Sequence, residues 1–173
     1  MTISRLSAGE QYKGHDRVIR LLPRLAAEFP DIAYVIGGDG DDRGRLETLA
    51  TGQGVAHLCR FIGHIPDEEI VEHYRMADVL VMPSTGEGFG IVFLEAMACG
   101  TPAIGLDVDG SVDPLERNPI GYAVSETTLH RCIAQLLART REKKLSNGPR
   151  ATEIFTVPAF TQHVSALMQT WFT

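Results

Sequence analysis

Residues 78–106 read Asp-Val-Leu-Val-Met-Pro-Ser-Thr-Gly-Glu-Gly-Phe-Gly-Ile-Val-Phe-Leu-Glu-Ala-Met-Ala-Cys-Gly-Thr-Pro-Ala-Ile-Gly-Leu. Residues 78–82 form a short segment that is apolar after Asp78, which is typical of a strand buried on both faces. A glycine-rich loop follows, and residues 90–99 then form a helix that Gly100 closes. Residues 102–106 form a second apolar run. This order of strand, loop, helix and strand predicts a parallel sheet covered by helices.

The same alternation continues on both sides of this segment. Further strands are expected at residues 3–6, 32–38, 55–63 and 122–124, and further helices at residues 16–29, 43–51, 67–76, 126–139 and 158–171. Pro23 should bend the helix at 16–29, and Asp41 or Asp42 can cap the helix that follows them. The sequence therefore predicts a doubly wound, Rossmann-like α/β fold with helices on both faces of the sheet.

Length and composition limit the possible classes. The 173 residues carry 16 Lys and Arg against 22 Asp and Glu, a net charge of −6, and are 44% hydrophobic. A chain of this length supports one core, so a single domain over residues 1–173 is expected, with 141–150 as a connection between helices. The acidic balance argues against a general nucleic-acid binder.

Several cellular locations are disfavoured as well. No apolar run of about 18 residues is present to span a membrane, and the start of the chain lacks the apolar core of a signal peptide. Three widely spaced cysteines, Cys59, Cys99 and Cys132, fit core or surface positions in a reducing compartment. A cytoplasmic protein is therefore expected.

The loop after residue 82 carries the expected chemistry. Its alternate glycines, Gly86, Gly88 and Gly90, allow sharp turns and close approach of a ligand. They end where a helix begins, and the amide groups of that helix end form an anion site suited to a phosphate. Glu87 lies among these glycines; it is either a solvated loop charge or a ligand-binding group.

Glu95 lies in the helix that follows. Its neighbours three and four positions away are Ile91, Val92, Ala98 and Cys99, all apolar, and the helix contains no Lys or Arg. A buried carboxylate without a partner is costly, so we expect a group from outside the helix, such as the ribose diol of a nucleotide, to bind it. The alternative is that Glu95 faces solvent.

Glu87 and Glu95 match the Glu-x7-Glu pattern of the group 1 retaining glycosyltransferases, enzymes of two-domain GT-B architecture, and the chain resembles this family. The resemblance covers about residues 3–104, in order and in spacing. Its blocks are Ser-Arg-Leu at 4–6 with Tyr-Lys-Gly-His-Asp at 12–16, Val-Ile-Gly-Gly-Asp-Gly at 35–40, Arg-Phe-Ile-Gly-His-Ile at 60–65, Tyr-Arg-Met-Ala-Asp-Val at 74–79, and residues 83–90 with 96–102.

The resemblance implies that Arg5 and Lys13 neutralise the donor diphosphate, and that Glu87 contacts the transferred sugar near its reacting carbon. These three are the expected catalytic residues. The other expected donor-binding positions are Gly88, Phe89, Gly90 and Ile91 on the phosphates, Glu95 on the ribose, and the main chain of Gly63, His64 and Ile65 beside the base. The implied reaction transfers a hexose-type sugar from a nucleoside diphosphate sugar to a hydroxyl acceptor with retention, and needs neither metal nor other cofactor.

The chain departs from the family pattern in three places. Ser4 stands where the family usually has Gly, and residues 107–114 replace the Gly-Gly-x-x-Glu motif. An amino-terminal acceptor domain is also missing, so the chain resembles the donor-binding half alone. The helix at 158–171 often reaches the other domain in this architecture, and exposed Trp171 or Phe172 would agree with that. The full enzyme is expected in the cytoplasm or against the inner face of the membrane.

Other functions fit the residues less well. A dinucleotide-binding dehydrogenase needs a third glycine where Arg43 stands. A metal-dependent transferase of the other common glycosyltransferase fold would use Asp-x-Asp to hold a divalent ion. This pattern occurs at 107–109 and 39–41, but so short a pattern recurs by chance. The six histidines lack the spacing of zinc ligands. A module that only binds a nucleotide sugar, or half of a GT-B sugar-nucleotide epimerase, remains the alternative.

Overall fold

The computed structural model describes residues 1–146, with side chains to residue 140. Its strands are β1 (Thr2–Ile3), β2 (Tyr34–Gly37), β3 (Cys59–Gly63), β4 (Leu80–Val81), β5 (Ala103–Leu106) and β6 (Gly121–Val124). Its α-helices are α1 (His15–Glu28), α2 (Arg43–Gly52), α3 (Ile70–Met76), α4 (Ile91–Ala98), α5 (Val112–Glu116) and α6 (Glu126–Ser146), and two 3-10 helices are η1 (Ala8–Lys13) and η2 (Ala56–Leu58).

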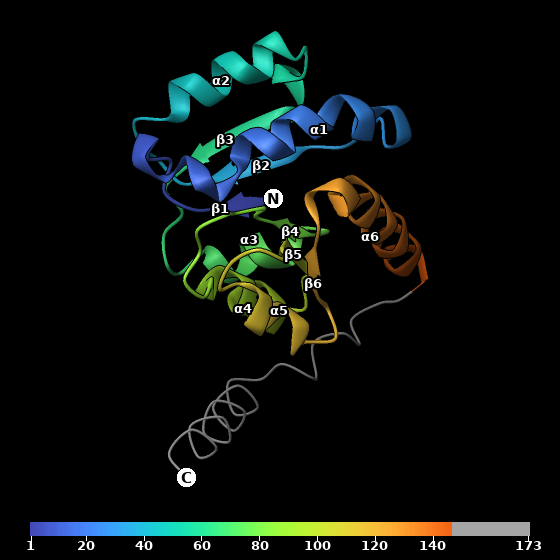
Figure 1. Cartoon of the computed structure of the whole chain (residues 1–173). Coiled ribbons are helices and arrows are strands. Elements are labelled where there is room, and N and C mark those ends of the chain that lie inside the picture. Colours follow the sequence, from blue (N-terminus) through green and yellow to red (C-terminus); the bar gives the residue numbers. More distant parts are fainter. Residues whose placement is uncertain (147–173) are drawn as a thin grey trace.

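The strands form two parallel ladders that meet between β1 and β4 (Figure 1). One ladder has the order β1-β2-β3 and the other β4-β5-β6. The Val81 N–H donates to Met1 O at 2.9 Å, whereas the N–H groups of Leu80 and Met82 donate toward β5. The strand order across both ladders is therefore β3-β2-β1-β4-β5-β6, the order of a doubly wound Rossmann-like fold.

Alternate residues of β4 and its flanks enter two separate cores. Val79 and Val81 pack in the core beneath α1, α2 and α6, whereas Leu80 and Met82 pack in the core beneath α3, α4 and α5. This alternation follows from the two-residue period of a strand, and Figure 1 shows the two sets of helices on either side of the strands. The predicted fold class, with helices on both faces, is confirmed.

Element boundaries differ from the sequence predictions at several points. The strand expected at 3–6 is β1 at Thr2–Ile3, although Ser4 still donates its N–H to Gly37 at the end of β2, and Leu6 donates its N–H to Asp39 just beyond. The strand expected at 55–63 begins with η2 and only then becomes β3. Residues 67–69 form a turn before α3 rather than its first helical turn.

Two short helices and a longer α6 were not predicted. η1 and α5 lie in segments where the sequence predicted only loops. Since α6 continues to Ser146, the prediction of a connection at 141–150 is wrong for residues 141–146. Residues 147–150, the helix expected at 158–171, Trp171 and Phe172 lie outside the described residues.

One local prediction stays untested and another needs correction. α1 runs through Pro23 without interruption, Pro23 is exposed there, and the bend expected at this residue stays a prediction. Asp42 is the N-cap residue of α2, but its carboxylate makes no capping hydrogen bond; it accepts from the Arg45 guanidinium at 2.6 and 2.7 Å instead. A charged bidentate pair is the stronger bond and outcompetes a backbone amide for the same oxygens.

The described cysteines are unpaired: Cys59 is buried, and Cys99 and Cys132 are partly buried. Among residues 1–146, no helix is both long enough and apolar enough to cross a bilayer.

Candidate functional site

The order of the strands reverses between β1 and β4: β2 and β3 follow on one side of this point, and β5 and β6 follow on the other. The segment after β1 leads through η1 to α1, and the loop at 83–90 after β4 leads to α4. In a doubly wound sheet, ligands bind beyond the carboxyl ends of the strands at this point. These two segments therefore frame the candidate site.

Direct contacts hold η1 against the loop that follows β4. The Thr85 N–H donates to Tyr12 O at 2.9 Å. Gly14 has a φ of 79°, and a Cβ at this position would lie 2.2 Å from Pro83 O. The Tyr12 ring lies so close to Gly86 that a Cβ there would be 3.1 Å from it. Glycines at positions 14 and 86 therefore allow the two segments of the site to touch.

The two predicted diphosphate-binding cations share one carboxylate. Arg5 Nη2 lies 2.5 Å from Glu10 Oε1, and Lys13 Nζ lies 3.5 Å from Glu10 Oε2. The Arg5 side chain is 79% exposed, whereas those of Lys13 and Glu10 are only 13% and 17% exposed. The structure therefore brings Arg5 and Lys13 together, and Glu10, which the sequence analysis did not select, lies between them.

The amino end of α4 is open. Gly90 is its N-cap residue with a φ of 78°, and as a glycine it has no side chain with which to cap the helix. The first amide groups of a helix have no partner within it, and the flanking Phe89 and Ile91 are 45% and 65% exposed. This geometry agrees with the predicted anion site at the start of α4.

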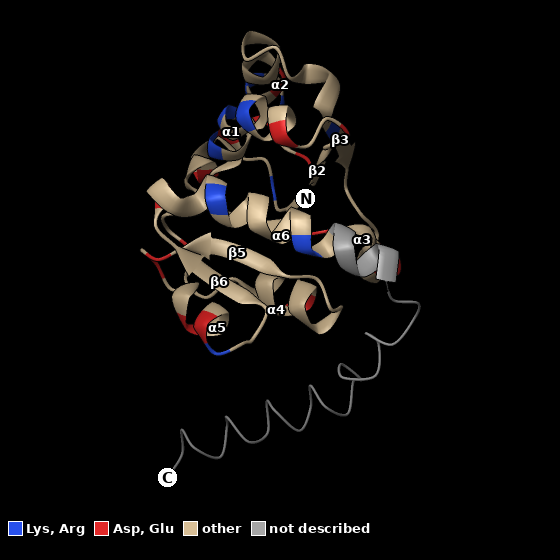
Figure 2. Ribbon diagram, turned by 90° about the vertical axis from the view of Figure 1, so that its right-hand side faces the viewer, with Lys and Arg blue, Asp and Glu red and all other residues tan. Residues whose placement is uncertain are grey.

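Glu95 differs from its prediction in both burial and pairing. The residue is exposed, and Tyr74 Oη donates a hydrogen bond to its Oε2 at 2.7 Å. The expectation of a buried carboxylate without a protein partner is therefore wrong. The residues of α4 that enter the core are Phe93, Ala96 and Met97, so Glu95 lies on the opposite, outer stripe of the helix. It is the one charged residue of α4 (Figure 2).

Burial of the Tyr74 hydroxyl and the hydrogen bond that it donates to Glu95 raise the pKa of Tyr74 far above its ordinary value. The hydroxyl therefore remains a permanent donor, which fixes one oxygen of Glu95 and leaves Oε1 without a hydrogen bond from residues 1–146.

The segment predicted to line the base, residues 63–65, begins at the last residue of β3. Gly63 has a φ of 74° and its carbonyl accepts from the Gly38 N–H at 2.7 Å. Ile65 is buried and His64 is exposed. Since Gly38 follows β2, this segment lies beside the turn that resembles the family's Gly-Asp-Gly motif.

Asp109 is a residue that the sequence analysis missed. Its Oδ2 accepts from Glu87 N at 2.8 Å and from the Ser84 hydroxyl, and its Oδ1 accepts from the N–H and hydroxyl of Ser111 at 3.0 and 2.6 Å. In the sequence this residue stands out only as part of an Asp-x-Asp metal pattern. The Asp-Gly-Ser triplet at 109–111, with Ser two residues after Asp, is the signal of an Asx-type turn that could have indicated this role.

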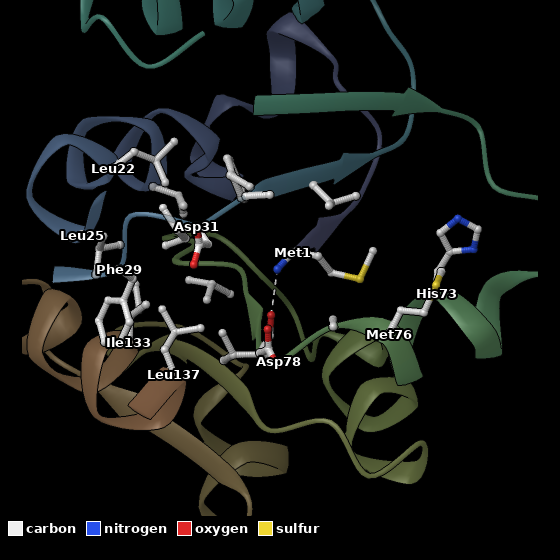
Figure 3. A pocket seen from close by; sticks show the side chains of 18 residues that line it. Met1, Leu22, Leu25, Phe29, Asp31, His73, Met76, Asp78, Ile133 and Leu137 are labelled. Atoms are coloured by element: carbon white, nitrogen blue, oxygen red, sulfur yellow. Dashed lines mark hydrogen bonds between the residues drawn. The ribbon is translucent and has the colours of Figure 1, made fainter. Parts of the chain in front are cut away.

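A cavity of about 280 Å³ lies elsewhere in the molecule. It is lined by apolar residues of α1 and α6 and by the starts of β1 and β4, around Met1 and Asp78 (Figure 3). Because these are the amino ends of the strands, the cavity is not where a ligand of this fold is expected. Within residues 1–146, no three His, Cys, Asp or Glu residues gather as a possible metal site.

Comparison with known proteins agrees with this architecture. The family model "Glycosyl transferases group 1" matches residues 3–151. A GDP-mannose-dependent alpha-(1-6)-phosphatidylinositol monomannoside mannosyltransferase of Mycolicibacterium smegmatis is 37% identical over 139 residues, which are 75% of this chain and 36% of that protein. A D-inositol 3-phosphate glycosyltransferase of Geodermatophilus obscurus is 42% identical over 107 residues, covering 57% of this chain and 24% of that protein.

Solved structures show the same fold at lower identity. Anabaena Alr3699/HepE in complex with UDP and glucose aligns with a TM-score of 0.71 and 23% identity, covering 98% of this chain and 47% of that one. The glycosyltransferase WaaG, involved in lipopolysaccharide biosynthesis, aligns with a TM-score of 0.65 and 22% identity, covering 94% and 46%. The chain thus spans less than half the length of these relatives. With its family model matched over most of its length, the chain belongs to the group 1 glycosyltransferase family and has the fold of a GT-B glycosyltransferase domain.

Proposed function

We propose that this chain is the donor-binding domain of a retaining glycosyltransferase, which transfers a hexose-type sugar from a nucleoside diphosphate sugar to a hydroxyl acceptor. The observation that carries the proposal is the contact, at the switch point of the sheet, between η1, whose Lys13 shares Glu10 with Arg5, and the glycine loop that leads to the start of α4. Two cations and a helix amino end together suit a diphosphate. An amino-terminal domain would supply the acceptor site.

In this proposal the chain acts by positioning and by charge. Arg5, Lys13 and the amides from Gly88 to Ile91 bind the diphosphate and stabilise the negative charge that develops as it leaves. Glu87 binds hydroxyls of the transferred sugar. This chemistry needs no metal, and the whole enzyme works in the cytoplasm or at the inner face of the membrane.

The remaining donor contacts lie on either side of the phosphates. The main chain of Gly63, His64 and Ile65 lines the base. Glu95 binds the ribose, and this role rests on the family resemblance and on the exposed carboxylate that Tyr74 orients.

Calorimetric titration with UDP, GDP and ADP, and then with their sugar forms, tests the proposal. We expect one nucleotide to bind and its sugar form to bind more tightly. Failure of all of them to bind at millimolar concentration would contradict the proposal. Conversion of the donor sugar into its epimer without acceptor would favour the alternative, a GT-B epimerase.

Replacing Glu95 by Ala is expected to raise the Kd of the nucleotide that binds. Loss of charge-assisted hydrogen bonds to ribose removes roughly 1.5–3 kcal/mol, which is about a 10- to 150-fold weaker Kd. Glu72→Ala is the matched control, because Glu72 is an exposed carboxylate of neighbouring α3 that pairs with Arg75 at 2.9 Å. Equal affinities for the Glu95 and Glu72 variants would reject the ribose role.

A further inference from the structure

The main chain of Glu87 is held on both sides by the loop that follows β5. Its N–H donates to Asp109 Oδ2 at 2.8 Å, and its carbonyl accepts from the Gly110 N–H at 2.8 Å. A Cβ at Gly110 would lie 1.9 Å from Gly88 O, so this approach requires glycine. Two consecutive residues, Asp109 and Gly110, thus fix the position of the Glu87 backbone.

The Asp109 carboxylate is itself tightly fixed. Each of its oxygens accepts two hydrogen bonds: Ser111 provides both donors at Oδ1, and Ser84 and Glu87 provide those at Oδ2. Burial raises the pKa of Asp109, but the hydrogen bonds from Ser111, Ser84 and Glu87 outweigh burial and lower it below the ordinary value. The group is therefore a permanent acceptor whose lone pairs are already engaged, which argues against a role as a metal ligand.

Asp109 also connects three parts of the site. Ser84 follows β4 and is fully buried, Glu87 lies in the glycine loop, and Ser111 is the N-cap residue of α5. A shift of the carboxylate would therefore move the backbone of Glu87 relative to the end of β4.

We propose that Asp109 is a positioning residue, which holds Glu87 where its side chain can meet the transferred sugar. This inference rests on the proposed function. It assigns Asp109 no contact with the donor: Asp109 acts through the backbone of Glu87, whereas Arg5, Lys13 and the α4 amides bind the diphosphate independently of it.

The substitution Asp109→Asn tests this role, because the amide keeps the size of the side chain but replaces one acceptor oxygen by a donor. With the nucleotide identified by the titrations above, we expect the Kd of the nucleoside diphosphate to stay within about threefold of the unaltered chain. The tighter binding contributed by the sugar should be lost, as it should be in Glu87→Gln. The double variant Asp109→Asn/Glu87→Gln should lose no more of the sugar's contribution to binding than Glu87→Gln alone.

Asp113→Asn is the matched control, because Asp113 lies four residues away and pairs with Arg117 at 2.8 Å on the surface. It should leave both Kd values unchanged. An equal weakening of nucleotide and nucleotide-sugar binding in Asp109→Asn would assign Asp109 to general support of the site and overturn the positioning role. If Asp109→Asn still binds the nucleotide sugar more tightly than the nucleotide, by as much as the unaltered chain does, the positioning role is overturned as well.

Hydrogen exchange of the Glu87 amide provides a readout that needs no donor. Loss of a hydrogen bond to a charged acceptor should speed this exchange by about 10- to 150-fold in Asp109→Asn, while amides of β5 keep their rates. Unchanged exchange at Glu87 would contradict the inference. Absence of any nucleotide binding by the unaltered chain would instead contradict the proposed function, so the two failures are distinguishable.

Discussion

Replacing Phe93 by Ala is expected to lower the free energy of unfolding by about 3–5 kcal/mol, the range for truncating a buried aromatic side chain. Phe93 is 0% exposed in the core beneath α3, α4 and α5. Its ring fills the space beneath two glycines: a Cβ at Gly90 would lie 2.4 Å from it, and a Cβ at Gly105 3.1 Å. Removal of the ring therefore leaves a cavity directly under the start of α4.

Urea denaturation followed by circular dichroism measures this change, and Phe89→Ala is the matched control. Phe89 lies four residues earlier and is 45% exposed, so its truncation should cost less than about 1 kcal/mol. Equal losses in the two variants would contradict the packing described for α4. If Phe93→Ala does not fold, Phe93→Leu should fold with a smaller loss of about 1–2 kcal/mol.

The fold could be predicted because strand and helix signals are local. Residues 79–82 alternate between two cores, so all four positions are apolar, and this pattern separates a doubly covered parallel strand from a surface strand. η1 and α5 were missed because they are short helices, of six and five residues, held by tertiary contacts. Tyr12, for example, is positioned by its hydrogen bond to Thr85, some 70 residues away in the sequence.

The face of α4 that packs against the core could not be predicted from the composition of the helix. Seven of its eight residues are apolar, so the whole helix looked buried and Glu95 with it. The buried positions 93, 96 and 97 recur at three- and four-residue spacing, whereas Ile91 and Glu95 share the opposite stripe. Partners from distant segments, Tyr74 for Glu95 and Glu10 for the Arg5–Lys13 pair, depend on the folded chain and leave no local signal.

Acidification from pH 7 to pH 4 is expected to remove about 3 kcal/mol of stability through His15 alone. Burial, together with the nearby positive charge of Lys13, lowers the pKa of His15 to about 4. The unfolded chain binds this proton near pH 6.5, so between pH 6.5 and 4 the unfolded state holds more protons than the folded one. The contribution is therefore complete above pH 6.5 and is lost as the pH falls toward 4.

A buried chain of hydrogen bonds explains why His15 remains neutral. Val81 O can only accept, so the Thr2 hydroxyl donates to it and Tyr34 Oη donates to Thr2. His15 Nδ1 then donates to Tyr34 at 3.2 Å. The Ser4 hydroxyl lies 2.8 Å from Nε2 and 3.1 Å from the Arg5 carbonyl, and we assign its proton to the shorter bond, in which Nε2 accepts. Both ring nitrogens are thus satisfied in the neutral form, and a positive charge would be buried without a carboxylate bonded to it.

Urea denaturation at pH 7 and pH 5 measures this effect, with about 2 kcal/mol of the His15 contribution lost by pH 5. His15→Gln should show a pH-dependent loss smaller by about that amount, whereas His57→Gln, which replaces an exposed histidine of η2, should match the unaltered chain. His130 and the Met1 ammonium, whose pKa values burial also lowers, change stability in the same direction, but they are common to all three proteins and cancel in the comparison. An equal pH-dependent loss in His15→Gln and in the unaltered chain would show that the proton does not bind at His15, and the buried hydrogen-bond chain would then have to be assigned differently.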